Sequence, residues 1–392
     1  MAITINAKTS GAGGLETTAD NTGNINIQSG GSTVMSVTSS GVAITGALSQ
    51  NGGAYSTQPT FRNRIINGDM RIHQRGGTIT AASATVYYGL DRFWGFAGTG
   101  QFSMEQSTDA PDNFLNSMKV TVTTVDSSMA ASDRYMLSQP IEGLNVTDLD
   151  FGSATAKTVT LSFWVKSSIT GTFGVVLING NATRTYVKEY TINSANTWEK
   201  KTITIAGDTT GTWTYTNALW GSVRFCLATG STYQGTDSTW NAGNYISTSN
   251  QTNLMATSGA TFYITGVQLE VGSTATDFEV LPYDVQLARC ERYFQKIDGG
   301  FGVATASTNV QINVVMRVPM RATPSAAVTT LRITDMTTAD HQATSATISL
   351  PNITPTMSRT NCGGFTGLTT SRAYTLLGSS TSAAPILFSA EL

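Results

Sequence analysis

The sequence predicts an all-β protein, and three observations lead to this prediction. Short stretches in which apolar and polar residues alternate recur along most of the 392 residues. Threonine, serine and asparagine fill these stretches, and such residues suit strands and turns better than helix interiors. One stretch, 284–296, has the spacing of a helix. We therefore expect an N-terminal β-segment, a large β-sandwich, a short linking helix and a small C-terminal β-sandwich.

Residues 1–58 contain short alternating pieces separated by glycine, serine and asparagine. Examples are Ile25 and Ile27, then Met35 and Val37. Each piece has one thin apolar face, and burying that face in a single copy would barely offset the entropy of ordering it. Two structures are therefore open for this segment: a β-shaft in which three copies wind around one axis, or a flexible tail.

The span 59–283 contains longer strand patterns. Within 158–166, every second residue from Val159 to Val165 is apolar. Many strands without helical spacing between them indicate an all-β sandwich, here one jelly roll with long loops. The predicted strands of this span are 117–125, 158–166, 172–178, 184–192, 201–206, 222–228 and 261–269.

A helix is predicted for 284–296, directly after Pro282, with Asp284 as its cap. Such a short helix needs partners, so we expect it to pack at the joint between domains or against its copies in an oligomer. Strand patterns resume in the remaining residues, 297–392, which suit a small β-sandwich. The predicted strands there are 309–318, 327–333, 345–350, 373–377 and 385–391.

The stretch 262–296 also carries a resemblance to a known class of protein. It resembles the joint between a jelly roll and a distal domain in bacteriophage tail fibre and receptor-binding proteins, and 64–76 (RIINGDMRIHQRG) resembles the entry to their carbohydrate-binding-module-like jelly roll. The residues that match at the joint are Gly266, Gln268, Leu269, Glu270, Gly272, Ala275, Thr276, Phe278, Glu279, Leu287, Cys290, Arg292, Tyr293 and Phe294. The resemblance implies a virion protein but names no receptor.

Composition excludes several classes of function. Charged residues make up 12% of the chain, about half the roughly 25% of ordinary soluble domains. With a net charge of −2, we expect no nucleic-acid partner. No secretory signal or run of about 18 apolar residues appears, so we expect synthesis in a host cytoplasm and no membrane insertion. The three cysteines, Cys226, Cys290 and Cys362, have no metal spacing and are expected to be reduced thiols.

No catalytic constellation is visible, so we do not expect an enzyme. His73 and His341 lie far apart in the sequence, and no triad, phosphate loop or metal motif appears. Glu270, Asp277 and Glu279 cluster as a glycan hydrolase would require. However, Gln268, Leu269 and Glu270 belong to the resembling stretch, and we expect Gln268, Glu270 and Glu279 to make structural hydrogen bonds at the joint rather than to form a site.

We expect no cofactor, with one alternative. Acidic side chains gather in loop-like stretches, where they could bind a structural calcium ion through their oxygens or could simply be solvated turns. These residues are Asp109, Asp112, Asp148 and Asp150.

The aromatic residues fall into two groups. Trp94, Trp164 and Trp198 lie where the jelly-roll resemblance implies core packing. By contrast, 207–249 mixes aromatic rings with small polar residues, the combination that sugar recognition requires. Trp213, Tyr233 and Trp240 are therefore the predicted glycan-contacting residues. The alternative is a set of long loops held in place by buried aromatic rings.

The resemblance implies a structural virion protein, a phage tail fibre, and the aromatic loops lead us to expect that it recognises host surface glycans without covalent chemistry. Residues 1–58 would attach to other virion proteins and form a homotrimer. The distal loops 335–345 and 354–372 are a second candidate surface. A head fibre, decoration or adaptor protein is the structural alternative, and a polysaccharide depolymerase is a weaker one.

Overall fold

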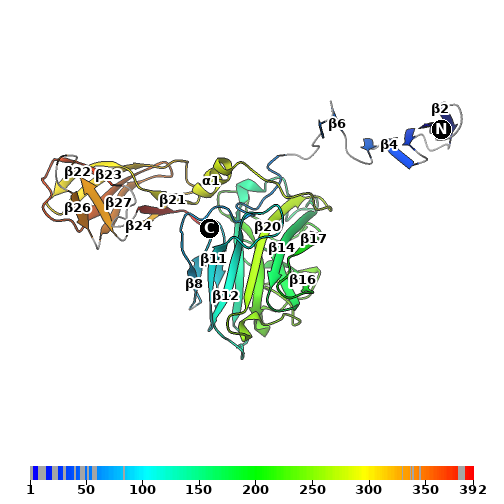
Figure 1. Cartoon of the computed structure of the whole chain (residues 1–392), viewed down its shortest axis with the longest axis horizontal. Coiled ribbons are helices and arrows are strands. Elements are labelled where there is room, and N and C mark those ends of the chain that lie inside the picture. The colour runs from blue at the N-terminus through cyan, green and yellow to red at the C-terminus, as the bar shows by residue number, and fades with distance from the viewer. Residues whose placement is uncertain are drawn as a thin grey trace. The chain divides into compact units, whose positions relative to one another are not determined.

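The chain is a nearly all-β protein in this computed structural model, as the sequence predicted (Figure 1). The structure describes residues 3–7, 15–19, 25–29, 32–38, 41–44, 49–50, 53–54 and 60–392, apart from 83, 329, 336, 338–339, 344–345 and 378–384. Two compact units are present, Met1–Thr60 and Phe61–Leu392. Within the described residues, no helix is long and apolar enough to cross a membrane.

The N-terminal unit contains one five-stranded sheet and one short hairpin. The sheet has the order β2-β1-β3-β4-β5, in which β1 and β3 run parallel. The strands are β1 (Ile3–Ala7), β2 (Leu15–Ala19), β3 (Ile25–Ser29), β4 (Ser32–Thr38) and β5 (Gly41–Ile44), with β6 (Ser49–Gln50) and β7 (Gly53–Ala54) as the hairpin. Apolar side chains on this sheet stay accessible, since Ile25 is 41% and Val42 is 57% exposed. Winding into a trimer stays a prediction.

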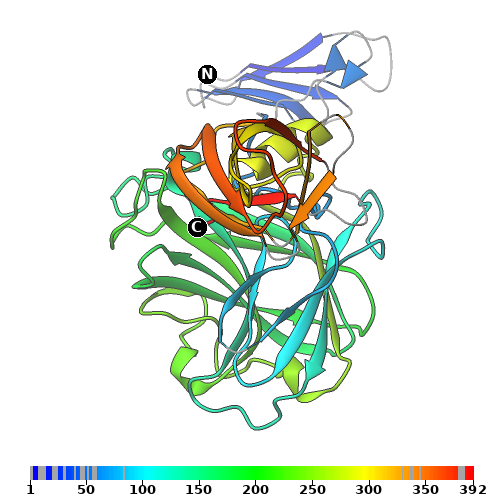
Figure 2. The same ribbon diagram turned by 90° about the vertical axis from the view of Figure 1, so that its left-hand side faces the viewer.

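The larger sandwich consists of two antiparallel sheets that pack face to face (Figure 2). The six-stranded sheet contains, in order, β17 (Glu199–Ile205), β14 (Val159–Ser167), β20 (Thr261–Val271), β12 (Ser117–Thr124), β11 (Gln101–Ser107) and β8 (Ile79–Ala81). The seven-stranded sheet contains β19 (Thr239–Ala242), β16 (Arg184–Ile192), β15 (Gly171–Asn179), β18 (Leu219–Thr229), β13 (Arg134–Glu142), β10 (Trp94–Phe96) and β9 (Val86–Tyr88). The connections include three short 3-10 helices, Gly143–Asn145, Ser231–Tyr233 and Leu254–Ala256.

Alternation along each strand builds the core between these sheets. Leu161 and Phe163 of β14 meet Val175 and Phe225 of the opposite sheet in one continuous buried cluster. Phe163 and Phe225 touch edge to face, with ring centroids 5.0 Å apart. The side chains that alternate with these residues therefore point away from the core, onto the outer face of each sheet.

The distal sandwich has its own buried cluster between two further sheets. One sheet contains, in order, β26 (Asp340–Ala343), β25 (Leu331–Thr334), β29 (Ala373–Leu376), β22 (Phe301–Ala306), β23 (Asn309–Val315), β28 (Met357–Gly363) and β27 (Thr347–Ile353). The other contains β21 (Phe294–Ile297), β30 (Ile386–Ser389) and β24 (Ser325–Ala327). The strand predicted over 327–333 is wrong in its middle, because β24 ends at Ala327 and β25 begins at Leu331.

The linking helix α1 spans Tyr283–Glu291 and is shorter than predicted. The predicted end at residue 296 is wrong because Phe294–Ile297 forms β21, which pairs with the C-terminal strand β30. Pro282 occupies the N-cap position and no side chain caps the helix, so the predicted capping by Asp284 is also wrong. Helix α1 lies between the two sandwiches in Figure 1, and its Cys290 packs with Ile66 and Ile72 of the larger one.

Buried charges hold this joint together. Arg92 of the larger sandwich is fully buried and forms an ion pair with Glu391, which follows β30. The guanidinium carbon of Arg92 lies 3.5 Å from the ring centroid of Tyr293. Tyr293 in turn donates a hydrogen bond of 2.5 Å to Glu142, which also binds Arg292. All three cysteines are free thiols, as predicted; all three are also buried, and Cys290 packs within the joint.

We expect Glu391→Gln to destabilise the joint, because it leaves the buried Arg92 without its counter-charge. Breaking a buried ion pair on one side costs about 3–5 kcal/mol. Chemical denaturation at pH 7 would measure this loss in the free energy of unfolding. Asp148→Asn is the matched control, because Asp148 pairs with Arg64 at the surface and its side chain is 43% exposed; we expect a loss below about 1 kcal/mol. Equal losses in the free energy of unfolding for Glu391→Gln and Asp148→Asn would contradict a stabilising role of the buried Arg92–Glu391 pair.

Candidate functional site

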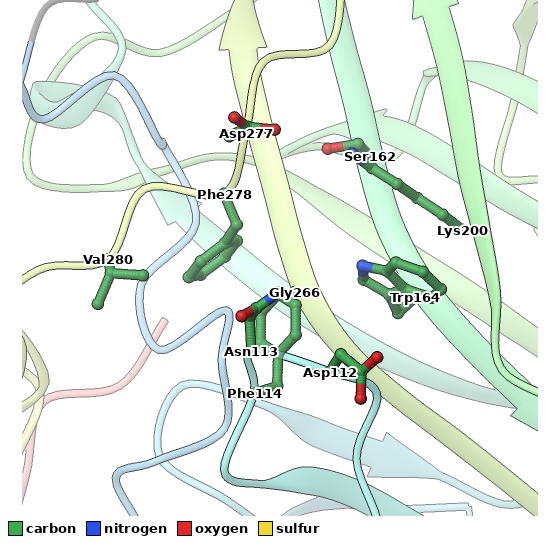
Figure 3. Close-up of a pocket in the computed structure, with 10 residues that line it drawn as sticks. All are labelled: Asp112, Asn113, Phe114, Ser162, Trp164, Lys200, Gly266, Asp277, Phe278 and Val280. Atoms are coloured by element: carbon green, nitrogen blue, oxygen red, sulfur yellow. The ribbon is translucent and has the colours of Figure 1, made fainter. Parts of the chain in front are cut away.

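A cavity of about 350 Å³ opens on the outer face of the six-stranded sheet (Figure 3). Strands of the sheet supply one wall, and two loop segments supply the other. The residues that line the cavity are Ser162 and Trp164 of β14, Gly266 of β20, Lys200 of β17, Asp112, Asn113 and Phe114 from the β11–β12 connection, and Asp277, Phe278 and Val280 after β20.

The alternation of β14 determines where Trp164 points. Phe163 and Val165 are buried in the core between the sheets, so Trp164 lies on the opposite face of the strand. Its ring is partly exposed and lines the cavity. The predicted core packing is therefore confirmed for Trp94, which is 8% exposed, and is wrong for Trp164. The alternation of the sequence itself contained this signal.

A β-bulge at Gly266 shapes the floor of the cavity. The register between β14 and β20 shifts between Ser162 and Trp164, where β20 contains one extra residue. Gly266 has a φ of +61°, and a Cβ atom there would lie 2.7 Å from the ring of Phe114 and 3.0 Å from that of Trp164. Only glycine fits without strain. The bulge therefore lets two aromatic rings approach the strand.

Aromatic rings and polar groups alternate around the cavity. Phe114 and Phe278 touch edge to face, with centroids 5.2 Å apart, and Figure 3 shows Trp164 and Phe278 on opposite sides of β20. Two carboxylates, Asp112 and Asp277, and the ammonium group of Lys200 stand at the rim. Such a set offers flat apolar surface together with hydrogen-bond donors and acceptors.

A second aromatic cluster lies further along the same face of the sheet. The ammonium nitrogen of Lys166 lies 4.4 Å from the ring centroid of Tyr263 and 5.2 Å from that of Trp198. Asp109 accepts hydrogen bonds from Lys166 and from Nε1 of Trp198, the latter at 3.1 Å. The bond from Lys166 lowers the pKa of Asp109 below its ordinary value. Trp198 is therefore a partly exposed surface residue rather than core.

Two of the three predicted glycan-contacting residues lie together beside the core. The ring centroids of Trp213 and Trp240 are 5.7 Å apart, and both rings pack around Phe151. Trp213 is only 7% exposed, and its Nε1 donates to Asp208 at 3.2 Å. Trp240 is partly exposed and donates to the carbonyl oxygen of Ala206 at 2.9 Å. The burial of Trp213 agrees with the alternative given above, in which a buried aromatic ring holds a long loop in place.

Tyr233 lies in a different cluster from the two tryptophans. It packs with Trp94, Met136 and Cys226 on the outer face of the seven-stranded sheet. Its ring centroid is 4.5 Å from the guanidinium carbon of Arg134. The structure therefore does not bring the three predicted residues into one site, and glycan contact by them stays a prediction.

The carboxylates near the joint make structural hydrogen bonds, as predicted. Glu270 accepts from Gln268 at 2.9 Å and from the hydroxyl of Thr276 at 2.7 Å. Glu279 accepts from the backbone N–H groups of Phe61 and Asn63, at 2.5 and 3.0 Å. These contacts fix the segment that follows β20.

Metal binding by the acidic loops stays a prediction. Asp109 and Asp148 form ion pairs with Lys166 and Arg64, while Asp112 lines the cavity. In the described part of the chain, no three acidic, histidine or cysteine side chains come together as metal ligands would.

Comparisons with known proteins give weak likenesses. No protein-family model matches the chain, and no curated protein matches its sequence. The tailspike protein 4 enzymatically active domain of Bacteriophage CBA120 is 13% identical with a TM-score of 0.30, and the match covers 54% of this chain and 22% of that one. A family 11 carbohydrate-binding module from Clostridium thermocellum is 14% identical with a TM-score of 0.26, over 50% of this chain and 100% of that one. Likenesses of this strength carry no functional argument.

We expect Asp208→Asn to loosen the Trp213 loop in a pH-dependent way. Burial favours a raised pKa for Asp208, but hydrogen bonds from Arg184 and Trp213 outweigh it and lower the pKa below its ordinary value. A lowered pKa stabilises the fold above about pH 4, and this stabilisation is lost as the pH falls through the folded value. The free energy of unfolding of the variant should be about 2–4 kcal/mol lower than that of wild type at pH 7. This difference in the free energy of unfolding should be smaller at pH 3.

Denaturation followed by tryptophan fluorescence at both pH values measures this difference. Asp284→Asn is the control, because Asp284 is exposed in the first turn of α1 and should change stability by less than about 1 kcal/mol. If Asp208→Asn lowers the free energy of unfolding as much at pH 3 as at pH 7, the ionised carboxylate of Asp208 does not stabilise the Trp213 loop.

Proposed function

We propose that the chain is a phage tail fibre protein that binds a host surface glycan without covalent chemistry, and that the cavity beside Trp164 is its contact site. The observation that carries this proposal is the partly exposed indole ring of Trp164 within a cavity of about 350 Å³ rimmed by carboxylate, amide and ammonium groups. Ligand cavities in proteins range from roughly 300 to 1,000 Å³. The cavity is therefore large enough for a small part of a saccharide.

The chemistry of the rim fits the two sides of a sugar ring. A pyranose presents axial C–H groups on its faces and hydroxyl groups at its edge, so an aromatic plane supports the face while polar groups bind the edge. Trp164 supplies the plane, and Asn113 and Asp112 supply an amide and a carboxylate for the hydroxyls. Carboxylates accept and amides both donate and accept, which matches hydroxyl groups that do both.

The cavity is already formed without a ligand, which favours glycan binding. Trp164 is fixed on a central strand of the sheet, and the bulge at Gly266 holds Phe114 beside it. A site built on rigid strands loses little conformational entropy when a ligand binds. Weak contact at each site would be compensated if residues 1–58 join three copies and attach them to other virion proteins, because linked sites act with a high effective concentration.

One observation favours a depolymerase as a second candidate. Asp112 and Asp277 both line the cavity, and a pair of carboxylates around a glycosidic bond is what hydrolysis requires. Incubation of the protein with host polysaccharide separates the two functions. Release of new reducing ends, lost in Asp112→Asn, would establish hydrolysis, whereas non-covalent recognition predicts intact polymer.

We expect Trp164→Ala to weaken binding to host surface polysaccharide by roughly tenfold or more, because an aromatic anchor in a binding site contributes about 2 kcal/mol. The protein should remain folded, since Trp164 lies outside the core. Binding to host cells, before and after removal of surface polysaccharide, measures the effect, and thermal unfolding checks the fold. Trp240→Ala is the matched control. Loss of binding in the Trp240 variant alone would place the site in the 207–249 loops.

A further inference from the structure

The outer face of the seven-stranded sheet carries two arginines that have no acidic partner. Arg134 lies on β13 and Arg224 on the neighbouring strand β18. Two other arginines of low exposure are paired, Arg92 with Glu391 and Arg184 with Asp208. By contrast, neither Arg134 nor Arg224 forms an ion pair with any carboxylate in the described residues. Both residues are partly exposed, although the Nε atom of Arg224 is buried.

Aromatic rings hold the two guanidinium groups in place. The guanidinium carbon of Arg134 lies 4.6 Å from the ring centroid of Phe96 and 4.5 Å from that of Tyr233. That of Arg224 lies 6.0 Å from the ring centroid of Trp94. Such contacts stabilise a cation without neutralising it. The two guanidinium groups are therefore fixed against a mostly buried apolar cluster on the outer side of this sheet. We call this set the arginine face: Trp94, Phe96, Arg134, Arg224 and Tyr233.

Hydrogen-bonding capacity on this face is left unused. Arg224 donates from Nη1 to Oδ1 of Asn244 at 3.2 Å, but its Nε is buried without a partner. The hydroxyl of Ser138, which lies directly opposite Arg224 in the strand register, is also buried without a partner. A guanidinium has five N–H donors. Two buried hydrogen-bonding groups on neighbouring strands, Nε of Arg224 and the hydroxyl of Ser138, thus lack a partner in the described part of the chain.

The electrostatics of the face point the same way. Burial lowers the pKa of Arg224 to about 10, and the nearby positive charge of Arg134 lowers it further. Two like charges with incomplete solvation destabilise the fold, and an acidic side chain between them would relieve this cost. Because the described residues supply none, an external anion is the group that would complete the arrangement.

We propose that the arginine face is a second binding site, which takes the anionic group of an acidic polysaccharide: a carboxylate or a phosphate. Guanidinium groups bind both through paired, charge-assisted hydrogen bonds. The proposal deepens the proposed glycan recognition but uses the opposite sheet from Trp164, so either site can fail without the other. It also gives the predicted residue Tyr233 a role, in which its ring supports Arg134.

The competing explanation is that the two arginines only pack against the aromatic rings. The variant Arg224→Met separates these explanations, because replacing a buried unpaired charge by an apolar chain of similar length leaves stability unchanged or raises it. The proposal expects that the same variant loses affinity for anionic polymer. Arg134→Gln is a second variant, on a more accessible side chain, in case Arg224→Met does not fold.

The test uses the full chain with three polymers: polygalacturonate for carboxylates, polyglycerol phosphate for phosphates, and neutral dextran. We expect wild type to bind at least one anionic polymer, and each arginine variant to bind it roughly tenfold more weakly or worse, as for loss of a charged hydrogen bond. Lys157→Gln is the matched control, because Lys157 is exposed in the connection before β14 and forms no ion pair within the described residues; this variant should bind as wild type does.

Every result of this polymer-binding test either supports the anion site on the arginine face or overturns it. Binding of polygalacturonate alone or of polyglycerol phosphate alone identifies the anion, and unchanged binding in Trp164→Ala shows that the arginine face acts separately. Wild-type protein that binds neither anionic polymer at low salt would overturn the proposal. Equal weakening in Lys157→Gln would also overturn the proposal, because the attraction would then reflect overall charge rather than this face.

Discussion

The constraint that organises this protein is that a buried charge needs a partner. The chain has 23 basic and 25 acidic residues among 392, and it uses several of them inside the fold. Glu142 with Arg292 and Glu391 with Arg92 join the two sandwiches. Asp208 with Arg184 fixes the loop that contains Trp213. A buried charge without its partner destabilises the fold. The two segments that carry the partners of such a pair must therefore lie together.

The joint illustrates how such pairs support an element that cannot stand alone. Helix α1 has nine residues, which is too short for stability in isolation. Its Cys290 packs with Ile66 and Ile72 from the larger sandwich, while Glu291 pairs with Arg317 of the distal one. The helix is thus held between contacts from both sides. The helical part of the stretch that resembles fibre joints therefore serves structure, whereas Gly266, Asp277 and Phe278 of the same stretch line the cavity on the six-stranded sheet.

Local patterns predicted the strands well, whereas long-range pairing set their ends. The alternation of 158–166 agrees with β14 to within one residue, but β21 was predicted as helix because its partner β30 lies far along the chain. The cavity beside Trp164 could have been found from alternation, since Phe163 and Val165 fix the opposite face. The arginine face could not, because the closeness of Arg134 and Arg224 depends on the register of β13 with β18. Sequence alone contains no measure of that register.

The two outer faces of the larger sandwich differ in chemistry, and this difference limits what could bind both. The six-stranded face has an indole ring with carboxylates at its rim, whereas the seven-stranded face has unpaired arginines. Stacked sheets lie about 10 Å apart, and side chains on both sides widen that distance. A single sugar cannot touch both faces. A long polymer with neutral and anionic parts could reach both, and only for such a polymer would the two weak contacts combine into avidity.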